Sequence, residues 1–476
     1  MLLASLTIGE LAPRLLGDAG IGWHIRNGQL MLATHSITRA DSFSSTMSGQ
    51  PWYAWEWLYD AGIAGVHHAW GLNGVVFITA LMIALSFTLL FRLMLARGTG
   101  LPLAVILLVL AVGASAIHLF ARPHVVSWLL TLIWYQVLDT AEDSGDFHRL
   151  WWLPVITVLW VNLHGGFVVG FVLLAIHLLA GAIRHREKLL WIKRLSLVTG
   201  LSFLASFVNP YGYKLHIHVY QYLTNRFLMD HIDEFSSPNF HGVGQQCFLA
   251  LLLISIVALA VRREEVRWPR LLVMLFAAYS GLYASRNLPV SSMLLGLIAG
   301  PMLSRAIVHG PGVFAWVHAF SERMGAMEFR SRGHLWPPLV MLLGVAVCIG
   351  QGRLGDRQVM NAHFDGKRFP VQAAAAMESA GFPQTVFAPD YWGGYLIYRF
   401  YPRMKVVVDD RHDLYGEAFL QEYLTTIHVA PEWKKMLDDK QVEWVLLPEG
   451  SSLANALRES RWKVRYSDDT AVLLQK

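Results

Sequence analysis

Long apolar stretches, separated by short polar or basic segments, fill the first three quarters of the chain. A membrane-crossing helix needs about 20 apolar residues, and ten stretches come near that length. Residues 72–91, 101–120, 124–138, 246–261, 271–285, 288–304 and 337–350 are clear candidates, and 150–163, 165–183 and 195–208 are less regular. Residues 1–16 lack the basic start and the small-residue cleavage site of a signal peptide, so we count them as a short first span. The pattern predicts an α-helical polytopic membrane protein with about eleven transmembrane helices.

Basic clusters between these stretches orient the chain in the membrane. Lys and Arg gather on the cytoplasmic side of membrane proteins. Clusters occur at Arg92 and Arg97 and within 184–194, 262–270 and 305–332. All of them fall on one side only if residues 150–183 are broken at Asn162–Gly166. This arrangement predicts a cytoplasmic N-terminus, and it puts the long first loop (residues 17–70) and everything after residue 352 on the outer face.

In the last 120 residues, apolar and polar positions alternate over short stretches of four to ten residues. This pattern predicts a separate domain. Expected strands are Thr385–Ala388, Lys405–Asp409, Glu443–Leu447, Lys463–Tyr466 and Ala471–Leu474. Expected helices are Val371–Ser379, Gly394–Phe400, Glu417–Thr426, Glu432–Asp438 and Ser452–Glu459. We therefore divide the chain into a transmembrane domain (1–352) and an extracytoplasmic α/β domain (353–476) with a mostly parallel sheet. This second domain lacks a Gly-rich phosphate loop at a helix start.

Composition and charge support this division. Hydrophobic residues make up 54% of the 476 residues and charged residues only 15%, against roughly 25% in soluble domains. The last 120 residues nevertheless contain 31 of the 73 charged side chains, and both cysteines lie before residue 349. Disulfides and cysteine-based metal sites are therefore excluded from the last domain. The net charge of +5 is spread over short clusters, which argues against nucleic-acid binding.

Aromatic side chains are concentrated in the first loop, around three acids. Trp and Tyr at high density are typical of a membrane–water interface, and the run 51–60 reads PWYAWEWLYD. We expect two interfacial helices, at about 22–34 and 52–69. They would hold Asp18, Asp41 and Glu56 at the outer surface of the membrane.

The order of short motifs along the chain resembles a bacterial branch of the GT-C-type membrane glycosyltransferases. The motifs include Asp18, Trp23–Gly28, Asp41–Ser44, Pro51–Leu58, Arg122–His124, Trp160–Gly166, Asn209–Gly212, Glu234 with Ser237-Pro238, Arg286–Pro289, Tyr391–Leu396 and Asp409–Arg411. The resemblance implies transfer of a sugar from a polyprenyl-phosphate donor, with an acid of the first outer loop as the base. It assigns that role to Asp18. Relatives commonly have a second acid two residues later, where this chain has Gly20.

Each acid of the first loop also has a purely structural interpretation. Asp18 is a candidate base, but Asp is also a favoured helix cap. Glu56 lies between Trp55 and Trp57 and is either a buried acid with a raised pKa or part of a polar helix face. Asp41 is a third catalytic or metal-binding candidate, although a turn also accounts for it.

Basic residues near the outer ends of spans are candidates for binding the donor phosphate. Arg122 and Arg286 offer the guanidinium fork that suits phosphate, or they anchor the chain to lipid. His24, His124 and His164 are further candidates for a phosphate or a divalent ion, but histidines near helix ends often bond only to the backbone. The histidines do not show the spacing of metal ligands on a helix. A divalent metal ion is therefore only a possible cofactor, and the sequence identifies no set of ligands for it. For the charged run 409–413 we favour a salt-bridged docking loop over a catalytic cluster.

These observations favour an inverting glycosyltransferase at the outer face of a bacterial cytoplasmic membrane. Its partners would be a polyprenyl-phosphate-linked sugar, membrane lipids, and a glycan, lipid or protein acceptor. A non-catalytic scaffold or glycan-binding sensor is the main alternative, and Gly20 favours it. A lipid-carrier transporter is the third, although transporters usually place polar residues near the membrane midplane.

Overall fold

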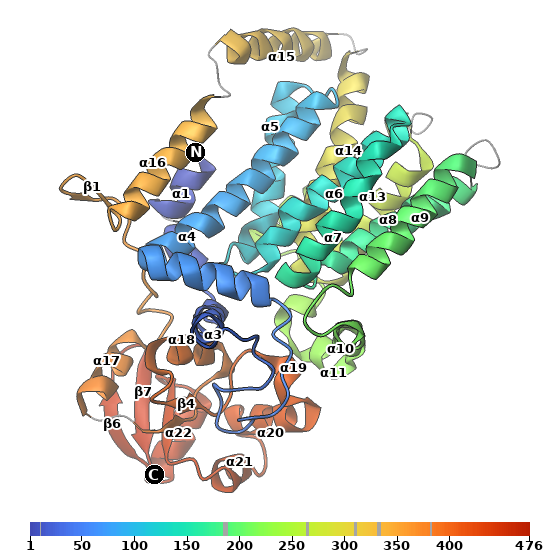
Figure 1. The fold of residues 1–476 in the computed structure, drawn as a ribbon. Helices are drawn as coiled ribbons and strands as arrows, with labels where there is room; N and C mark the ends of the chain where they lie inside the picture. The colour runs from blue at the N-terminus through green and yellow to red at the C-terminus, as the bar shows by residue number, and fades with distance from the viewer. Residues whose placement is uncertain (10, 184–188, 263–265, 309–311, 331–334, 381–382) are drawn as a thin grey trace.

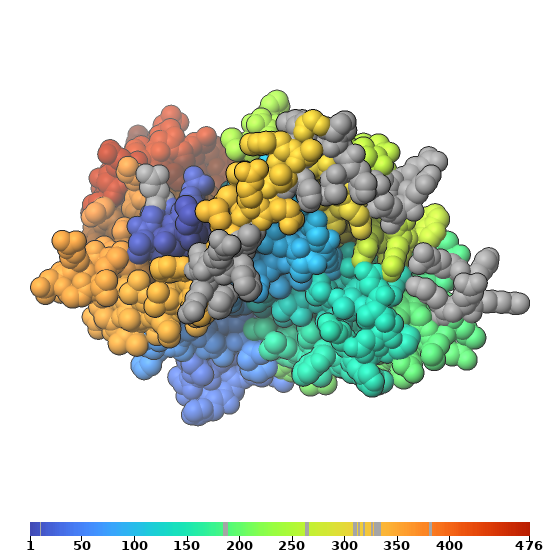
Figure 2. Space-filling model, turned by 90° about the horizontal axis from the view of Figure 1, so that it is seen from above, coloured from blue at the N-terminus to red at the C-terminus, as the bar shows by residue number. Residues whose placement is uncertain are grey.

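The computed structural model describes residues 1–9, 11–183, 189–262, 266–308, 312–330, 335–380 and 383–476. Helices form a bundle, and the C-terminal residues gather at one end of it (Figure 1). Helix α15 (Val313–Arg330) lies across the opposite end. In the view from the α15 end, the red C-terminal residues appear only at the margin (Figure 2). The two parts of the chain are therefore stacked along the bundle.

The bundle contains the helices that the apolar stretches predict. They are α4 (Trp57–Ala96), α5 (Leu101–Ser115), α6 (His124–Ser144), α7 (Trp152–Leu163), α8 (Phe167–Ile183), α9 (Leu189–Ala205), α12 (Val243–Arg262), α13 (Trp268–Tyr283), α14 (Leu288–Val308) and α16 (Trp336–Ile349). The predicted break is confirmed, because α7 ends at Leu163 and α8 begins at Phe167. The first segment differs from the prediction: residues 2–15 form two short helices, α1 (Leu2–Thr7) and α2 (Ala12–Leu15), instead of one span. Glu10 lies outside the described residues.

Length and apolar composition identify membrane-crossing segments among the described residues. Four helical segments meet both criteria: Trp57–Ala96, Leu101–His118, Val243–Val261 and Ser285–Ile307. Phe167–Ile183 and Trp336–Ile349 are shorter apolar helices. The chain is thus a multi-pass membrane protein, while the count of about eleven spans and the orientation stay predictions. Arg184, Arg186, Lys188, Arg263 and Arg332, from the basic clusters, lie outside the described residues.

The first loop contains two helices between the bundle and the C-terminal residues. Helix α3 (Gly20–Thr34) corresponds to the first predicted interfacial helix. The second corresponds to the first part of α4, from Trp57 to the kink at Gly71, where φ is 59° and the helix changes direction. Because L side chains rarely adopt this conformation, glycine allows the interfacial part to turn into the span. Figure 1 shows the two parts of α4 at an angle, with α3 beneath them.

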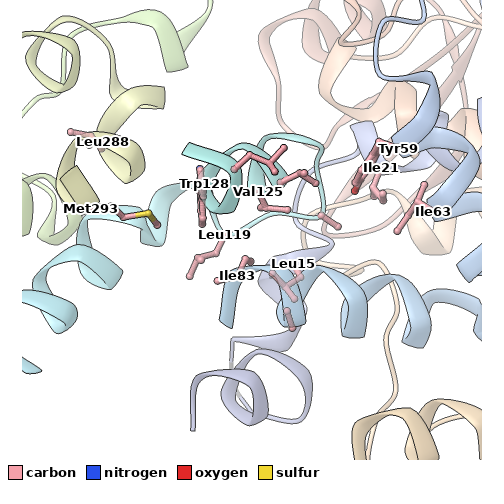
Figure 3. Close-up of a cluster of buried hydrophobic side chains, with 14 of the residues drawn as sticks. Leu15, Ile21, Tyr59, Ile63, Ile83, Leu119, Val125, Trp128, Leu288 and Met293 are labelled. Carbon is pink, nitrogen blue, oxygen red and sulfur yellow. The ribbon is translucent and has the colours of Figure 1, made fainter. Parts of the chain in front are cut away.

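Buried apolar side chains fill the space where these segments meet. Figure 3 shows Leu15, Ile21, Tyr59, Ile63, Ile83, Leu119, Val125, Trp128, Leu288 and Met293, which come from α2, α3, α4, α6, α14 and the 119–123 turn. Burial of such side chains is the main favourable term in folding. This cluster fixes the ends of several helices relative to the first loop, and these ends carry the charged residues of the candidate site.

The C-terminal region combines helices with short strands. Its strands are β1 (Arg353–Leu354), β2 (Arg357–Gln358), β3 (Thr385–Val386), β4 (Lys405–Val406), β5 (Trp444–Pro448), β6 (Lys463–Ser467) and β7 (Ala471–Gln475). Its helices are α17 (Val371–Ala380), α18 (Asp390–Phe400), α19 (His412–Tyr415), α20 (Glu417–Ile427), α21 (Lys434–Asp439) and α22 (Ser452–Glu459). Strands β3 and β4 are parallel, but the three-stranded sheet β5-β7-β6 is antiparallel. The prediction of a mostly parallel sheet was wrong, because β6 and β7 form a hairpin.

The C-terminal region packs directly on the first loop. Helix α3 lies against α18, and glycines allow the close approach: a Cβ added to Gly22 would lie 2.1 Å from the Gly394 carbonyl oxygen. The first loop also adds to the edge of β4, where Ser45 N–H donates to the Val406 carbonyl at 2.8 Å and the Thr46 hydroxyl donates to the Val407 carbonyl at 2.6 Å. The loop and the C-terminal region therefore form a continuous interface.

Candidate functional site

A cavity of about 360 Å³ lies between the helix bundle, the first loop and the C-terminal region. One part of its wall is polar and includes His24, Glu56, Arg122, Glu234, Arg286 and Asp410. Another part is apolar and includes Val168, Val169, Val219, Leu223 and Val290. The polar residues come from helix ends and from the turns between helices, which the buried core holds in place. A cavity with both kinds of wall suits an amphiphilic ligand with a polar head and an apolar tail.

Arg122 lies at the centre of three carboxylates from three different segments. Its Nη1 is 3.4 Å from Asp18 Oδ2 and 3.8 Å from Glu234 Oε2, and its Nη2 is 3.6 Å from Asp410 Oδ2. Burial alone would lower the pKa of Arg122, but the nearby carboxylates raise it above its ordinary value. The distances exceed those of direct charge-assisted hydrogen bonds, which are about 2.7–2.9 Å. The guanidinium of Arg122 is therefore held by the charges of the three acids more than by direct hydrogen bonds to them.

Arg286 is less enclosed by acids. Its Nη1 lies 3.6 Å from Glu234 Oε1, and its guanidinium stacks 4.5 Å from the centre of the Phe235 ring. Burial would raise the pKa of Glu234, but Arg286 and Arg122 lower it to about 2, so this acid is ionised at neutral pH. Helix α13 ends directly before Arg286, and the short η6 turn (Ser285–Asn287) presents it to the cavity.

Glu56 stands between two histidines in the wall of the cavity. Its Oε2 lies 3.8 Å from His24 Nε2, and its Oε1 lies 3.7 Å from His164 Nε2. The Gly166 N–H donates to His164 Nδ1 at 3.0 Å, so neutral His164 carries its proton on Nε2, facing Glu56. The other nitrogen of His24, Nδ1, is 2.6 Å from Asp60 Oδ1. Both imidazole rings are thus oriented toward Glu56.

Burial shifts the pKa values of Glu56 and His24. It raises the pKa of Glu56 to about 7 and lowers the pKa of His24 to about 4. At neutral pH, His24 is therefore uncharged, and Glu56 is close to half ionised. A carboxylate with a pKa near the working pH is suited to general base catalysis.

Asp18 has a position that agrees with both of its interpretations. Its Oδ1 accepts the Gly20 N–H at 2.8 Å at the start of α3, and its Oδ2 faces Arg122. Asp18 is not part of the cavity wall, whereas Asp410 is. Burial and the charge of Asp18 raise the pKa of Asp410 to about 7. The first loop and the C-terminal region therefore contribute one acid each to the surroundings of Arg122.

Asp41 lies away from the cavity in a buried ion pair. Arg411 contacts its carboxylate at 2.8 Å, and the Ser44 hydroxyl donates to it at 2.6 Å. Burial would raise the pKa of Asp41, but Arg411 and Ser44 lower it below its usual range. Arg411 also donates to Asp409 at 2.7 and 2.8 Å. These contacts account for Asp41 as a docking residue and match the interpretation of Asp409 and Arg411 as a docking loop.

Each of the three histidines has a contact that fixes the orientation of its ring. His24 and His164 face Glu56, as described above, while His124 Nε2 donates to the His118 carbonyl at 2.9 Å. His118 in turn donates to the Ser285 carbonyl at 3.0 Å, next to Arg286. Across the described residues, no group of three or more His, Cys, Asp or Glu side chains is arranged to hold a metal ion. The roles of these histidines in phosphate binding stay predictions.

Six residues that the sequence proposed for the site line this cavity: His24, Glu56, Arg122, His124, His164 and Arg286. Glu234 and Asp410 also line it, but the sequence analysis did not propose them as site residues. Glu234 was part of the resemblance, but its position next to both arginines depends on tertiary packing. For Asp410 a signal existed, because the acidic pair follows β4, and polar residues after strands often lie at functional edges. The docking interpretation fits both acids, since Asp410 contacts Trp23 and Arg122, but Asp410 also lines the cavity.

Comparison with solved structures identifies the class of fold. The chain is similar to the oligosaccharyltransferase of Archaeoglobus fulgidus, with 11% identity, a TM-score of 0.56, and coverage of 94% of this chain and 68% of that one. A structure of AglB from the same organism, in complex with an inhibitory peptide and a dolichol-phosphate, gives a TM-score of 0.57 at 12% identity, with the same coverage. ArnT from Cupriavidus metallidurans matches 98% of this chain and 96% of its own, with 14% identity and a TM-score of 0.50.

The protein thus has the fold of the GT-C-type membrane glycosyltransferases. No protein-family model and no curated protein matches its sequence. The resemblance in the motifs and the similarity in structure agree with one another over nearly the whole chain.

Proposed function

We propose that the protein is an inverting glycosyltransferase that moves a sugar from a polyprenyl-phosphate-linked donor to an acceptor at the outer face of a bacterial cytoplasmic membrane. The cavity is the observation that carries this proposal. It joins an apolar wall to a polar wall with two arginines and a buried acid whose pKa is raised to about 7. Among the structural neighbours, one binds a dolichol-phosphate.

Arg286 is the best candidate for the donor phosphate. A guanidinium offers a rigid pair of donors to phosphate oxygens, and among the described residues Arg286 pairs with one carboxylate, from Glu234. Arg122 faces three carboxylates, so a phosphate there would meet more negative charge. The polyprenyl chain would lie along the apolar wall between α8, α10 (Tyr213–Thr224) and α14.

Glu56 is the best candidate for the base. An acceptor hydroxyl would give its proton to Glu56 as its oxygen attacks the anomeric carbon, and the bond from that carbon to the phosphate oxygen would break. The polyprenyl phosphate would leave as an anion that Arg286 stabilises. A single displacement of this kind inverts the anomeric configuration. Asp18 is the second candidate, since the resemblance assigns the base to it.

A transfer assay tests the proposal directly. Purified protein is incubated with a panel of labelled polyprenyl-phosphate sugars and with glycan, lipid and peptide acceptors, and the label is followed into product. We expect transfer from at least one donor, with inverted configuration by NMR. Donor binding without transfer to any acceptor would instead support a glycan-binding scaffold.

The orientation is tested independently with single cysteines in a Cys247→Ala, Cys348→Ala background. Thr224 is the last residue of α10 and Ser379 belongs to α17, two helices on the C-terminal side of the bundle (Figure 1). Ser144 is the last residue of α6, whose first residue, His124, lines the cavity. Cysteines at 224 and 379 should react with a membrane-impermeant thiol reagent in intact cells, and one at 144 should react only after lysis. The reverse pattern would place the C-terminal region inside.

A further inference from the structure

The C-terminal region places one carboxylate in the cavity wall, next to the first loop. Asp410 Oδ1 accepts a hydrogen bond from Trp23 Nε1–H at 3.0 Å, and Oδ2 lies 3.6 Å from Arg122 Nη2. Trp23 thus holds one oxygen, and the other lies beside Arg122 and Gly20, in a residue that lines the cavity. The side chain is only 15% exposed, so it is held and not solvated freely.

Gly20 makes room for this carboxylate. A Cβ added to Gly20 would lie 2.6 Å from Asp410 Oδ2 and 2.9 Å from Asp18 Oδ1. Real Cβ atoms do not approach other atoms at 2.6 Å, so a side chain at position 20 and the carboxylate of Asp410 exclude one another in this arrangement. The carboxylate of Asp410 therefore occupies the space that a side chain at residue 20 would fill.

The neighbouring residues hold Asp410 in this position. Asp409 and Arg411 on either side are locked in the buried ion pair with Asp41, and Asp409 also accepts a hydrogen bond from the Tyr415 hydroxyl at 2.8 Å. With both neighbours fixed, the backbone has little freedom to turn the side chain of Asp410 away. Docking of the C-terminal region and placement of this acid are thus one structural event.

We propose that Asp410 is a substrate-binding residue that accepts a hydrogen bond from a hydroxyl group of the transferred sugar beside Arg122, so that the C-terminal region completes the site. The proposal rests on the proposed glycosyltransferase function. Carboxylates are acceptors for the hydroxyl groups of sugars, and the three carboxylates lie 3.4–3.8 Å from Arg122, beyond the length of a direct charge-assisted hydrogen bond of about 2.7–2.9 Å.

The charges around Arg122 also select the class of sugar. Glu234 and Asp410 line the cavity on either side of Arg122, so a sugar that carries a carboxylate would meet like charges there. A neutral sugar offers only hydroxyl donors, and an amino sugar offers a cation. The donor is therefore a neutral or amino sugar and not a uronic acid.

Moving the carboxylate from position 410 to position 20 tests the role of Asp410. The variants are Gly20→Asp, Asp410→Ala and the double variant, with Gly62→Asp and Asp469→Ala as matched controls. An added Cβ at Gly62 has no atom within 4 Å, and Asp469 is exposed in the C-terminal region. Each protein is measured for thermal unfolding in detergent and for transfer from the donor that the wild type uses.

Asp410→Ala should fold and lose transfer by about ten- to a hundredfold, the loss expected for a hydrogen bond to a charged group. Gly20→Asp should lower both the melting temperature and transfer, because the new side chain collides with Asp410. The double variant should melt higher than Gly20→Asp and recover transfer above both single variants, since it moves the carboxylate from position 410 to position 20. Both controls should behave as the wild type.

Three outcomes separate the possible errors. Wild-type transfer in Asp410→Ala would overturn the role of Asp410 and leave the proposed function intact. Efficient transfer of a uronic acid would overturn the selection by charge. A wild type that transfers no sugar from any donor would refute the proposed function, and with it the role of Asp410.

Discussion

Two arginines join the first loop to the C-terminal region, and carboxylates hold them in different ways. Arg411 contacts Asp41 and Asp409 at 2.7–2.8 Å, and its side chain is 1% exposed. Arg122 lies 3.4–3.6 Å from Asp18 and Asp410, and its side chain is 27% exposed. Both arginines line the cavity, but direct hydrogen bonds close the cluster of Arg411, whereas the carboxylates around Arg122 lie farther from it.

This difference separates a structural ion pair from a binding site. A buried ion pair is tolerated when its geometry is good, and in the cluster of Arg411 the hydroxyl groups of Ser44 and Tyr415 donate further hydrogen bonds to Asp41 and Asp409. Arg411 Nη1 is buried without a hydrogen-bond partner among the described residues. The cluster of Arg122 keeps its charges apart, at a cost that a ligand can offset. Adjacent residues of one loop therefore differ in their surroundings: Asp409 is hydrogen-bonded inside the docking cluster, while Asp410 lines the cavity, where our proposal assigns it to substrate binding.

The largest effect is expected from breaking the closed cluster. Arg411→Gln leaves Asp41 and Asp409 buried without their counter-charge, which typically costs about 3–5 kcal/mol. We expect a large drop in the melting temperature, measured by tryptophan fluorescence in detergent. Arg399→Gln is the control, because Arg399 pairs with Glu378 on the surface and is 45% exposed, where a pair is worth about 1 kcal/mol or less. Equal melting of the two variants would contradict a structural role for the closed cluster.

The same cluster gives the stability a defined pH dependence. The pKa of Asp41 is lower in the folded protein than its unfolded value of about 3.9. Its contribution to stability is therefore complete above pH 4 and is lost as the pH falls through the lower folded pKa. Asp41→Asn should remove this acid sensitivity while it lowers stability near neutral pH.

The next largest effect is expected at the open cavity. Glu56→Gln removes the proposed proton acceptor, and general base catalysis typically contributes 10²–10⁴-fold. We expect a transfer rate at least a hundredfold lower, with little change in melting temperature because the amide keeps the size of the side chain. A rate within tenfold of the wild type would exclude Glu56 as the base.

The pH profile sharpens this result. Charged and titratable groups near Glu56 are His24, Asp60, His164, Arg122 and Asp413. Since a base must be deprotonated and the pKa of Glu56 is raised to about 7, transfer by the wild type should rise through pH 7 and stay high above it. Because the pKa of Asp410 is also raised to about 7, the comparison is made in the Asp410→Ala background, where the rise should persist with Glu56 and be absent after Glu56→Gln.

The sequence predicted the helices better than the pairing of strands. Apolar stretches and basic clusters were enough to locate the break between α7 and α8, because a misplaced break would reverse the sides of the basic residues. The same signals wrongly predicted one span at the start of the chain, where Pro13 lies in the first turn of a second short helix, α2. The order of β-strands does not fix their partners, yet the connection of only three residues between β6 and β7 has the length of a hairpin loop.

For the site, the sequence supplied the candidates but not their partners. Glu56, Arg122 and Arg286 are unusual at the ends of apolar stretches, so their chemistry is visible locally. Whether an arginine faces one carboxylate or three depends on packing between segments over 100 residues apart, such as Arg122 with Glu234 and Asp410. The sequence alone could not distinguish Arg286 from Arg122 or Asp410 from Asp409.

An intermediate effect is expected when the two cavity arginines are compared. Arg286→Gln should weaken binding of a polyprenyl phosphate by about ten- to a hundredfold, because a charge-assisted contact is lost. Arg122→Gln should weaken it less but lower the melting temperature more, since three acids lose their shared cation. Binding is measured with a fluorescent polyprenyl phosphate, and a bulk phospholipid serves as the control ligand. Unchanged binding in both variants would leave the arginines as lipid anchors.

The smallest effect is expected from Asp18→Asn. The amide keeps an oxygen that can accept the Gly20 N–H, and it removes only one of the three negative charges near Arg122. Because Asp18 lies outside the cavity wall, we expect transfer to fall by less than tenfold and the melting temperature to change little. Measured beside Glu56→Gln, this variant decides which first-loop acid is the base, since loss of a base costs about a hundredfold or more. A loss of that size in Asp18→Asn, with transfer retained in Glu56→Gln, would move the base to Asp18 and require the Arg122 cluster to open toward the acceptor during the reaction.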